Sequence, residues 1–252
     1  MKYIEFSPPS AFSGTDNIQF NASSEADFAS IGNTLIVTSP KKIVSYDTNG
    51  RKILDEDVNY QNLASVSNDK YILLYDLDGY SLSVYNSFSK VFEKTLDTSI
   101  DLVYLSDDGA FAVITHEKSY AGGVVVFNSN FKQVFSFMTR SSNITDVCFD
   151  GNQNLLACAT TDVRDGDFYS EIFTFDITND ENYKSRIELF GEMPLSMFCT
   201  GSGFAVMTDA GIHYYDFDGQ NKAYIDFEYD TPDSIYRFDN FFAVTLKSAL
   251  AT

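Results

Sequence analysis

Residues 70–96 read KYILLYDLDGYSLSVYNSFSKVFEKTL, and this stretch decides the fold. Three β-rich runs are separated by two turns, in the order Tyr71–Tyr75, Asp78-Gly79, Ser81–Tyr85, Asn86-Ser87 and Val91–Leu96. Asp-Gly between such runs is a strong hairpin signal, because glycine accepts the positive φ of a tight primed turn. With Leu63–Ser67 in front, the stretch predicts four short antiparallel strands.

The same unit recurs along the chain. In five copies a polar residue closes the third strand directly after an aromatic residue: Tyr46-Asp47, Tyr85-Asn86, Phe127-Asn128, Phe175-Asp176 and Tyr215-Asp216. The copies are about 40 residues apart, and four strands per copy at this period are typical of β-propeller blades. The longest interval, before Asp176, is assigned to longer loops at 161–168 and 177–182.

A second marker is the turn between the first and second strands of each copy. It recurs six times, at Gly32-Asn33, Asn68-Asp69, Asp107-Asp108-Gly109, Asp150-Gly151, Gly201-Ser202-Gly203 and Asp239-Asn240. The fold class is therefore all-β, a propeller of four-stranded antiparallel blades with five complete blades and a partial sixth. Repeats cover residues 27–246 of a single predicted domain, 1–252.

Two alternatives remain for the sixth blade, because an open end leaves an unpaired strand edge. In the first, strands at Tyr3–Phe6 and Ile18–Phe20, within the N-terminal segment 1–26, complete this blade and close the ring. In the second, the chain is a piece of a longer propeller. Closure is slightly favoured because it needs no further chain.

The composition of the chain limits the classes of partner that we expect. The 252 residues carry 17 basic and 36 acidic side chains, a net charge of −19. Such a field repels phosphate backbones, so a nucleic acid is not an expected partner.

Three cysteines, Cys148, Cys158 and Cys199, have no metal-binding spacing and are interpreted as buried thiols. No apolar run is long enough to span a membrane, and no export signal is visible.

The resemblance to known propellers rests on turn and strand endings. Ser106-Asp107-Asp108-Gly109 resembles the Ser-Pro-Asp-Gly turn of many WD40-like and quinoprotein-like blades. VSYDTNGRKI (Val44–Ile53) and HYYDFDGQNKAYI (His213–Ile225) are similar to the YD-x-x-G-K ending of quinoprotein-type blades. Over residues 27–246 the chain resembles an uncharacterised bacterial propeller family, a domain of unknown function.

That resemblance implies a location but no chemistry. Members of such a family are typically tethered at the extracytoplasmic face of a bacterial membrane by an N-terminal helix, which this chain lacks; a cytoplasmic location is the alternative. The motifs of functional propellers are missing as well. There is no Trp, no CxxCH, and Gly122-Gly123 is a lone pair rather than a repeated one.

One group of residues has the chemistry of a cation site. Asp162, Asp165, Asp167 and Glu171 crowd the predicted fourth-blade loop, and carboxylate oxygens are the ligands that Ca²⁺ prefers. The EF-hand pattern fails, because Val163-Arg164 follows Asp162. A solvated turn is the favoured interpretation, with Ca²⁺ as the alternative, and no other cofactor is expected.

A second group has the chemistry of a recognition surface. Tyr120, Phe168 and Tyr169 are aromatic residues of the two longest predicted loops, which join second to third strands and should emerge on one rim. Aromatic side chains are enriched at interaction hot spots, although these residues equally suit a role capping their own blades. The histidines, His116 and His213, are assigned to strand packing or to the surface.

The function predicted from these features is a non-catalytic binding or scaffold propeller that recognises a protein or a glycan through rim loops. The alternative is a metal-dependent hydrolase or lyase that uses carboxylates at the central channel. The non-catalytic function is favoured because no motif carries chemistry and fold alone does not imply catalysis.

Overall fold

The structure, a computed structural model, describes residues 26–117, 120–150, 154–179, 183–228, 230–238 and 241–247. All regular secondary structure within these ranges is β-strand. It follows that none of the described residues belongs to a helix able to span a membrane. The chain divides into two compact units, of which unit 1 ends at Thr95 and unit 2 begins at Leu96.

Unit 1 contains two four-stranded antiparallel sheets, each with its strands in chain order. The first sheet consists of β1 (Asp27–Ile31), β2 (Thr34–Ser39), β3 (Lys42–Tyr46) and β4 (Lys52–Asp57). The second consists of β5 (Leu63–Ser67), β6 (Ile72–Asp76), β7 (Ser81–Tyr85) and β8 (Lys90–Thr95).

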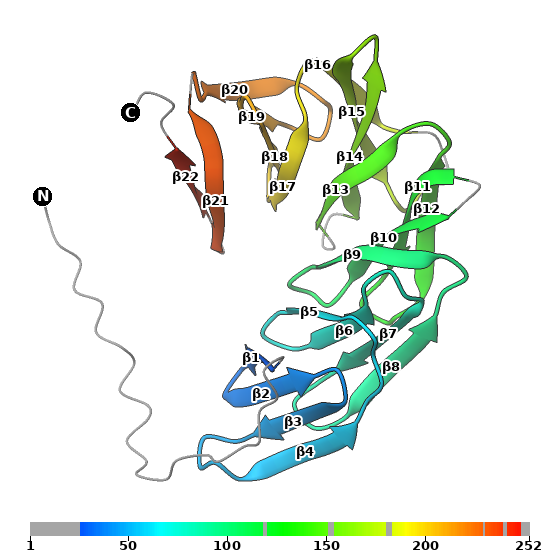
Figure 1. The fold of residues 1–252 in the computed structure, drawn as a ribbon, viewed down its shortest axis with the longest axis vertical. Coiled ribbons are helices and arrows are strands. Elements are labelled where there is room, and N and C mark those ends of the chain that lie inside the picture. The colour runs from blue at the N-terminus through cyan, green and yellow to red at the C-terminus, as the bar shows by residue number, and fades with distance from the viewer. Residues whose placement is uncertain are drawn as a thin grey trace, which may run out of the picture. The chain divides into compact units, whose positions relative to one another are not determined.

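Unit 2 contains three sheets of the same kind and one two-stranded sheet (Figure 1). The third sheet is β9 (Ser99–Leu105), β10 (Phe111–Glu117), β11 (Tyr120–Phe127) and β12 (Gln133–Thr139). The fourth is β13 (Asn143–Asp150), β14 (Leu155–Arg164), β15 (Asp167–Asp176) and β16 (Ser185–Phe190). The fifth is β17 (Pro194–Thr200), β18 (Gly203–Thr208), β19 (Gly211–Tyr215) and β20 (Asn221–Asp226), and β21 (Thr231–Phe238) with β22 (Phe241–Lys247) begins a sixth. The prediction of five complete blades and a partial sixth is confirmed.

The residue that marks the repeat in the sequence closes a turn in the structure. In all five copies its side-chain Oδ1 accepts a hydrogen bond from the backbone N–H two residues further on, at 2.8 to 3.1 Å. Asp and Asn suit this role because a short polar side chain can replace the missing strand partner of that N–H. The Asp or Asn that marks the repeat therefore recurs because the third strand of each of these five sheets ends in the same Asx turn.

The turn at Asp78-Gly79 differs from the prediction in one respect. The positive φ, 61°, belongs to Asp78, and Gly79 is not among the glycines with positive φ. Gly79 is required for space, because a Cβ added there would lie 2.6 Å from the Cβ of Asp76. The hairpin is confirmed, but its glycine serves a close approach of the chain to itself.

Apolar side chains from successive sheets form the cores. In unit 1, Ile36 and Ile43 of the first sheet lie in one buried cluster with Ile72, Leu74 and Tyr85 of the second. In unit 2, one cluster joins the third and fourth sheets and another joins the fourth and fifth. Each sheet thus buries a face against its neighbour, as expected for blades whose strands alternate inward and outward residues.

Two hydrogen bonds between neighbouring sheets occur at equivalent places in the two units. In unit 1, Ser45 Oγ on β3 donates to the carbonyl oxygen of Ser87 at 2.8 Å. In unit 2, Thr174 Oγ1 on β15 donates to the carbonyl oxygen of Phe217 at 2.9 Å. Each hydroxyl lies two residues before the Asx-turn residue of its own sheet, and each carbonyl belongs to the Asx turn of the next. Two of the five copies, those with Ser45 and Thr174, therefore form a polar link to the next sheet in addition to the shared core.

Two of the three cysteines have the buried environment that the sequence predicts. Cys148 and Cys158 are fully buried, and Cys199 is half-buried. Burial raises the pKa of the Cys158 thiol, and the nearby Asp146 carboxylate raises it further. Asp146 itself accepts a hydrogen bond of 2.7 Å from the Met197 N–H, which ties β13 to β17. These thiols have an environment typical of packing rather than of reactivity.

Several predictions concern residues outside the described ranges. They are the ring-closing strands at 3–6 and 18–20, most of the turn at Asp150-Gly151, and the turn at Asp239-Asn240. The other four turns between first and second strands fall between the strands as predicted.

Candidate functional site

The β14–β15 hairpin is the longest in the described part of the chain, with ten residues in each strand. Its strands are paired to their tip, where Arg164 faces Asp167 across a two-residue turn. Both turn residues have positive φ, 54° at Asp165 and 94° at Gly166, which defines a type I′ turn. The long loop predicted here is therefore wrong, because the segment continues the ladder.

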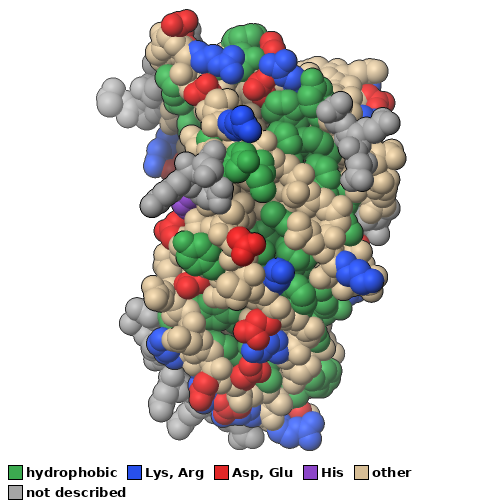
Figure 2. All heavy atoms as spheres, turned by 90° about the vertical axis from the view of Figure 1, so that its right-hand side faces the viewer, with side chains coloured by type: hydrophobic (Ala, Val, Ile, Leu, Met, Phe, Trp, Pro, Cys, Tyr) green, Lys and Arg blue, Asp and Glu red, His purple; other side chains and the backbone are tan. Residues whose placement is uncertain are grey.

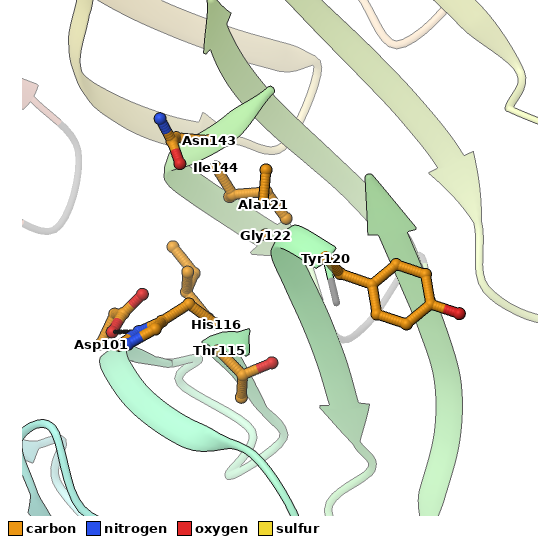
Figure 3. Close-up of a pocket in the computed structure, with 9 residues that line it drawn as sticks. Asp101, Thr115, His116, Tyr120, Ala121, Gly122, Asn143 and Ile144 are labelled. Atoms are coloured by element: carbon orange, nitrogen blue, oxygen red, sulfur yellow. Dashed lines mark hydrogen bonds and ion pairs between the residues drawn. The ribbon is translucent and has the colours of Figure 1, made fainter. Parts of the chain in front are cut away.

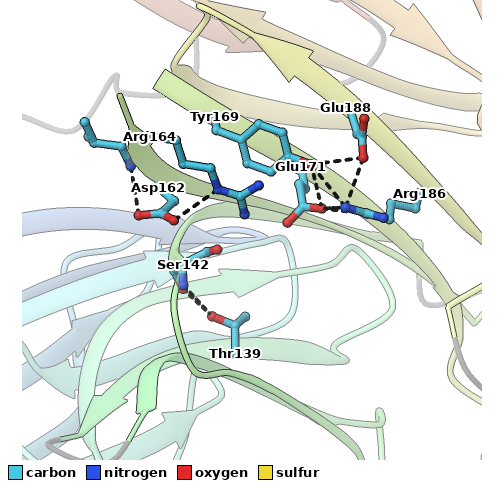
Figure 4. A network of polar contacts seen from close by, with 9 residues as sticks. Thr139, Ser142, Asp162, Arg164, Tyr169, Glu171, Arg186 and Glu188 are labelled. Atoms are coloured by element: carbon cyan, nitrogen blue, oxygen red, sulfur yellow. Dashed lines mark hydrogen bonds and ion pairs between the residues drawn. The ribbon is translucent and has the colours of Figure 1, made fainter. Parts of the chain in front are cut away.

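The register of this hairpin places polar and aromatic side chains on one face. Asp162 pairs with Tyr169 across β14 and β15, and Glu171 pairs with Glu188 across β15 and β16. Residues two apart in a strand lie on the same face, so Arg164 joins Asp162 there. This group, Asp162, Arg164, Tyr169, Glu171, Arg186 and Glu188, is called the hairpin network (Figure 4).

Tyr169 lies at the centre of the hairpin network. The Arg164 guanidinium carbon lies 3.5 Å from the centroid of its ring, a close cation–π contact. Its hydroxyl donates to Glu188 Oε1 at 2.9 Å and accepts from Arg186 Nη2 at 3.1 Å. Burial, together with the bond to Glu188, raises the pKa of Tyr169, so the phenol stays protonated and continues to donate.

The arginines neutralise the carboxylates that the sequence suggests as calcium ligands. Arg186 Nε donates to Glu171 Oε1 at 2.6 Å, and Arg164 Nε lies 3.4 Å from Asp162 Oδ2. Asp165 occupies the turn and Asp167 begins β15. Over the described ranges, no group of three or more His, Cys, Asp and Glu side chains is placed to hold a metal ion. Calcium binding stays a prediction from sequence, and the geometry does not add to it.

The predicted recognition aromatics lie in strands rather than in loops. Tyr169 is buried, because it packs against Phe190 with ring centroids 5.2 Å apart. Phe168 is 38% exposed, and Tyr120, at the start of β11, is half-buried. The residues that the prediction missed are Val163, 60% exposed, and Phe190, 70% exposed. Val163 of β14 pairs with Phe168 of β15. Phe190 of β16 pairs with Tyr169 of β15.

A pocket of about 250 Å³ lies between the third and fourth sheets. Its walls are Asp101 of β9, Ile114, Thr115 and His116 of β10, Tyr120, Ala121 and Gly122 of β11, and Asn143 and Ile144 of β13. In Figure 3 the Asp101 and His116 side chains point toward each other, while the Tyr120 ring extends away from them. The sequence predicts strand packing or the surface for His116, and it does not indicate the partner Asp101, which lies fifteen residues earlier on the neighbouring strand.

The pocket does not contain a catalytic triad, although Ser99, His116 and Asp101 are adjacent. His116 Nδ1 is hydrogen-bonded to Asp101 Oδ1. Ser99 Oγ, however, lies 3.2 Å from Nδ1 and 3.1 Å from Nε2 of the same ring. An oxygen equidistant from both nitrogens cannot lie along the lone pair of either, so the serine does not have the in-plane bond that activates a nucleophile.

The second histidine has a half-buried partner, Glu192, that the sequence does not indicate. His213 Nε2 on β19 lies 2.8 Å from Glu192 Oε2, and Thr208 Oγ1 donates to the same oxygen at 2.6 Å. The imidazole also packs on Tyr215 and Tyr224. His213 therefore has the strand-packing role that was predicted for it, with the connection between β16 and β17 supplying the carboxylate.

Within each unit, consecutive four-stranded antiparallel sheets share a buried core, and an equivalent hydrogen bond links one pair of them in each unit. This architecture defines the class of protein: it is a β-propeller. Known structures of this fold are similar to the chain over most of its length. The C-terminal WD40 domain of Sif2 has a TM-score of 0.61 at 12% identity, over 90% of this chain and 66% of that one. A eukaryotic initiation factor has a TM-score of 0.59 at 11% identity, over 91% of this chain and 58% of that one. BamB from Moraxella catarrhalis has a TM-score of 0.53 at 13% identity, over 86% of this chain and 68% of that one.

The family follows from the sequence. Residues 10–249 match a family of unknown function, DUF5711, and the chain belongs to it. No curated protein sequence matches this chain. At these identities the similar structures establish the fold alone, and the chain spans 58% of the initiation factor and 66% of the Sif2 domain. The predicted membership of an uncharacterised propeller family is confirmed.

Proposed function

We propose that this propeller is a non-catalytic binding module that recognises a partner protein through the end of the β14–β15 hairpin. The observation that carries the proposal is the exposure of Phe190 on the same face as the ordered hairpin network, with Val163 and Phe168 exposed on the opposite face of the same hairpin end. Exposed apolar side chains next to fixed aromatic and arginine groups have the composition of an interaction hot spot.

The hairpin network supports this function by fixing the surface before a partner arrives. Tyr169 is held by one cation–π contact and two hydrogen bonds, and Arg186 by two carboxylates. A surface that is already ordered loses little conformational entropy on binding, so more of the contact energy becomes affinity. On the face shown in Figure 2, basic side chains lie scattered among acidic ones, which does not suit a nucleic acid.

The choice between a protein and a glycan depends on which surface is considered. Large exposed apolar side chains favour a protein at the hairpin. The hydrolase or lyase alternative requires convergent carboxylates, but no group of three or more His, Cys, Asp and Glu side chains among the described residues is placed to hold a metal ion. Support is therefore strongest for binding without chemistry.

The experiment compares two phenylalanines of equal exposure. Phe190 is 70% exposed at the end of β16, and Phe88 is 68% exposed in the turn between β7 and β8. A protein captured by the wild-type chain is purified and titrated against wild type, Phe190→Ser and Phe88→Ser. We expect Phe190→Ser to weaken binding at least about tenfold and Phe88→Ser to leave it unchanged. Equal affinity of all three chains would remove the hairpin from the interface.

A further inference from the structure

The pocket between the third and fourth sheets has a wall chemistry that differs from that of the hairpin surface. Asp101, Thr115, His116 and Asn143 contribute polar groups, while Ile114, Ala121 and Ile144 contribute apolar ones. Asp101 and His116 have side chains 37% and 48% exposed, and Asn143 is also exposed. With a volume of about 250 Å³ the pocket is smaller than drug-sized ligand sites, so it fits one small molecule or one terminal residue of a chain.

Glycine brings the two sheets together at this pocket. A Cβ added at Gly122 would lie 2.8 Å from the backbone nitrogen of Ile144. Only a residue without a side chain allows β11 to approach β13 this closely. The pocket walls therefore belong to two sheets held at a fixed separation. This close approach explains why Gly122 and Gly123 are buried.

Asp101 determines what His116 offers to a ligand. In the neutral imidazole, Nδ1–H donates a hydrogen bond to the Asp101 carboxylate, which leaves the lone pair of Nε2 as an acceptor. Ser99 does not occupy that lone pair, because its oxygen is equidistant from both ring nitrogens. Asn143 adds both an amide donor and a carbonyl acceptor. The pocket thus presents acceptors on one wall and a combined donor and acceptor on another.

We propose that this pocket binds a neutral, polyhydroxylated ligand of the size of one sugar residue. Each hydroxyl both donates and accepts, which matches a wall that combines Asp101 and His116 with Asn143. An anion is disfavoured because the described residues of the lining contain no Lys or Arg and include Asp101. An organic cation would compete with His116 for Asp101, and a purely apolar ligand would leave Asp101 and Asn143 desolvated. The proposal does not depend on the hairpin surface, so either can fail without the other.

The test titrates the purified 252-residue chain with D-glucose, D-galactose, N-acetyl-D-glucosamine and glycerol, followed by saturation-transfer NMR. Sodium phosphate and 1,3-diaminopropane serve as the anionic and cationic probes. Asn143→Ala is the main variant because its side chain is exposed and its loss does not threaten folding. Asn130→Ala is the matched control, since Asn130 is exposed in the turn between β11 and β12, at the other end of the third sheet. Asp101→Asn tests whether the hydrogen bond between Asp101 and His116 Nδ1 is needed for binding, and thermal unfolding checks that this variant is folded.

We expect at least one of the sugars or glycerol to bind saturably, with affinity reduced at least about fivefold by Asn143→Ala and by Asp101→Asn. Asn130→Ala and Phe190→Ser should bind like the wild type. Three results would overturn the proposal: no binding of any hydroxylated probe at tens of millimolar, binding that Asn143→Ala leaves unchanged, or saturable binding of phosphate or the diamine that Asn143→Ala abolishes. Retained sugar binding by Phe190→Ser alongside a lost protein partner would show that the two sites are separate.

Discussion

Two hairpins of this molecule contain the same Asp-Gly dipeptide and turn in different ways. In the β6–β7 hairpin the last paired residues are Tyr75 and Leu82, and a connection of several residues surrounds Asp78-Gly79. In the β14–β15 hairpin Asp165-Gly166 is the whole connection. Asp-Gly therefore predicts that the chain reverses, but the side chains before it decide where the strands separate.

The difference arises from Asp76 in the shorter hairpin and from the hairpin network in the longer one. Asp76 Oδ1 accepts hydrogen bonds of 2.9 and 2.7 Å from the N–H groups of Gln61 and Asn62, which ties the end of β6 to the segment entering β5. In β14 no such anchor ends the strand, and Asp162, Arg164 and Tyr169 stabilise further pairing across the hairpin. One strand is ended by a bond to its neighbour, and the other is lengthened by its own side chains.

The largest expected effect comes from filling the space at Gly79. Gly79→Ala would place a Cβ 2.6 Å from the Cβ of Asp76, an atom that cannot move without breaking the bonds to residues 61 and 62. Overpacking of this kind costs about 2 to 3 kcal/mol. Urea unfolding of unit 1 measures it, and a loss below about 1 kcal/mol would show that Asp76 is not a rigid anchor.

A smaller effect is expected at Gly166, where the limit is conformation and not space. A Cβ there meets nothing within 4 Å, but the φ of 94° strains an L-residue. Gly166→Ala should cost about 1 to 2 kcal/mol, and Gly166→Asn less, because Asn tolerates positive φ. The same urea experiment on unit 2 measures both. If Ala and Asn destabilise equally, the cost does not come from φ.

The next prediction, for Tyr169→Phe, tests whether the hairpin network stabilises the β14–β15 hairpin. Tyr169→Phe keeps the ring under Arg164 but removes the hydroxyl that bonds Glu188 and Arg186. The expected loss is about 1 kcal/mol, because Arg186 keeps both of its carboxylates. Tyr80→Phe is the control, since Tyr80 is 53% exposed. Amide exchange at Arg164 and Asp167 should quicken in Tyr169→Phe alone, and unchanged exchange there would contradict the role given to the network.

These comparisons explain how far the sequence could predict the fold. The repeat was readable because each third strand ends in a local Asx turn, whose chemistry lies within four residues of Asp47 or Asn128. The length of β14 and β15 was not readable in the same way. It depends on contacts between Arg164, Tyr169 and Arg186, which the register brings together only after the hairpin has formed. Asp165-Gly166 nevertheless carries the type I′ signal, which predicts that the chain reverses there but not how long the two strands are.

The candidate sites were less predictable for the same reason. Tyr120, Phe168 and Tyr169 were chosen for their chemistry, and the structure buries Tyr169 and exposes Phe190 from a different strand. His116 was recognised as a lone histidine, but its partner Asp101 lies on the neighbouring strand. Neither sequence spacing nor composition shows which residues a register aligns. The exposure and the pairing of side chains, which determine a site, follow only from the folded structure.

The smallest expected effect is on stability at acidic pH, and it arises in the Asx turns rather than in the two hairpins. Three of the turn residues, Asp47, Asp176 and Asp216, are carboxylates, and the equivalent residues in the second and third sheets, Asn86 and Asn128, do not titrate. Backbone bonding by Arg51 lowers the pKa of Asp47, bonding by the Thr178 hydroxyl lowers that of Asp176, and bonding by Lys222 lowers that of Asp216.

A carboxyl whose pKa is lower in the folded state contributes stability that is complete above its ordinary value of 3.8 and is lost as the pH falls through the folded value. Replacing all three residues with Asn should therefore keep the Asx turns and reduce the drop in melting temperature between pH 6 and pH 3. Asp97→Asn, an exposed carboxylate outside these turns, is the control. The two natural asparagines indicate that the turn needs the oxygen and not the charge, so a triple variant that is as acid-sensitive as the wild type would place the acid sensitivity elsewhere in the molecule.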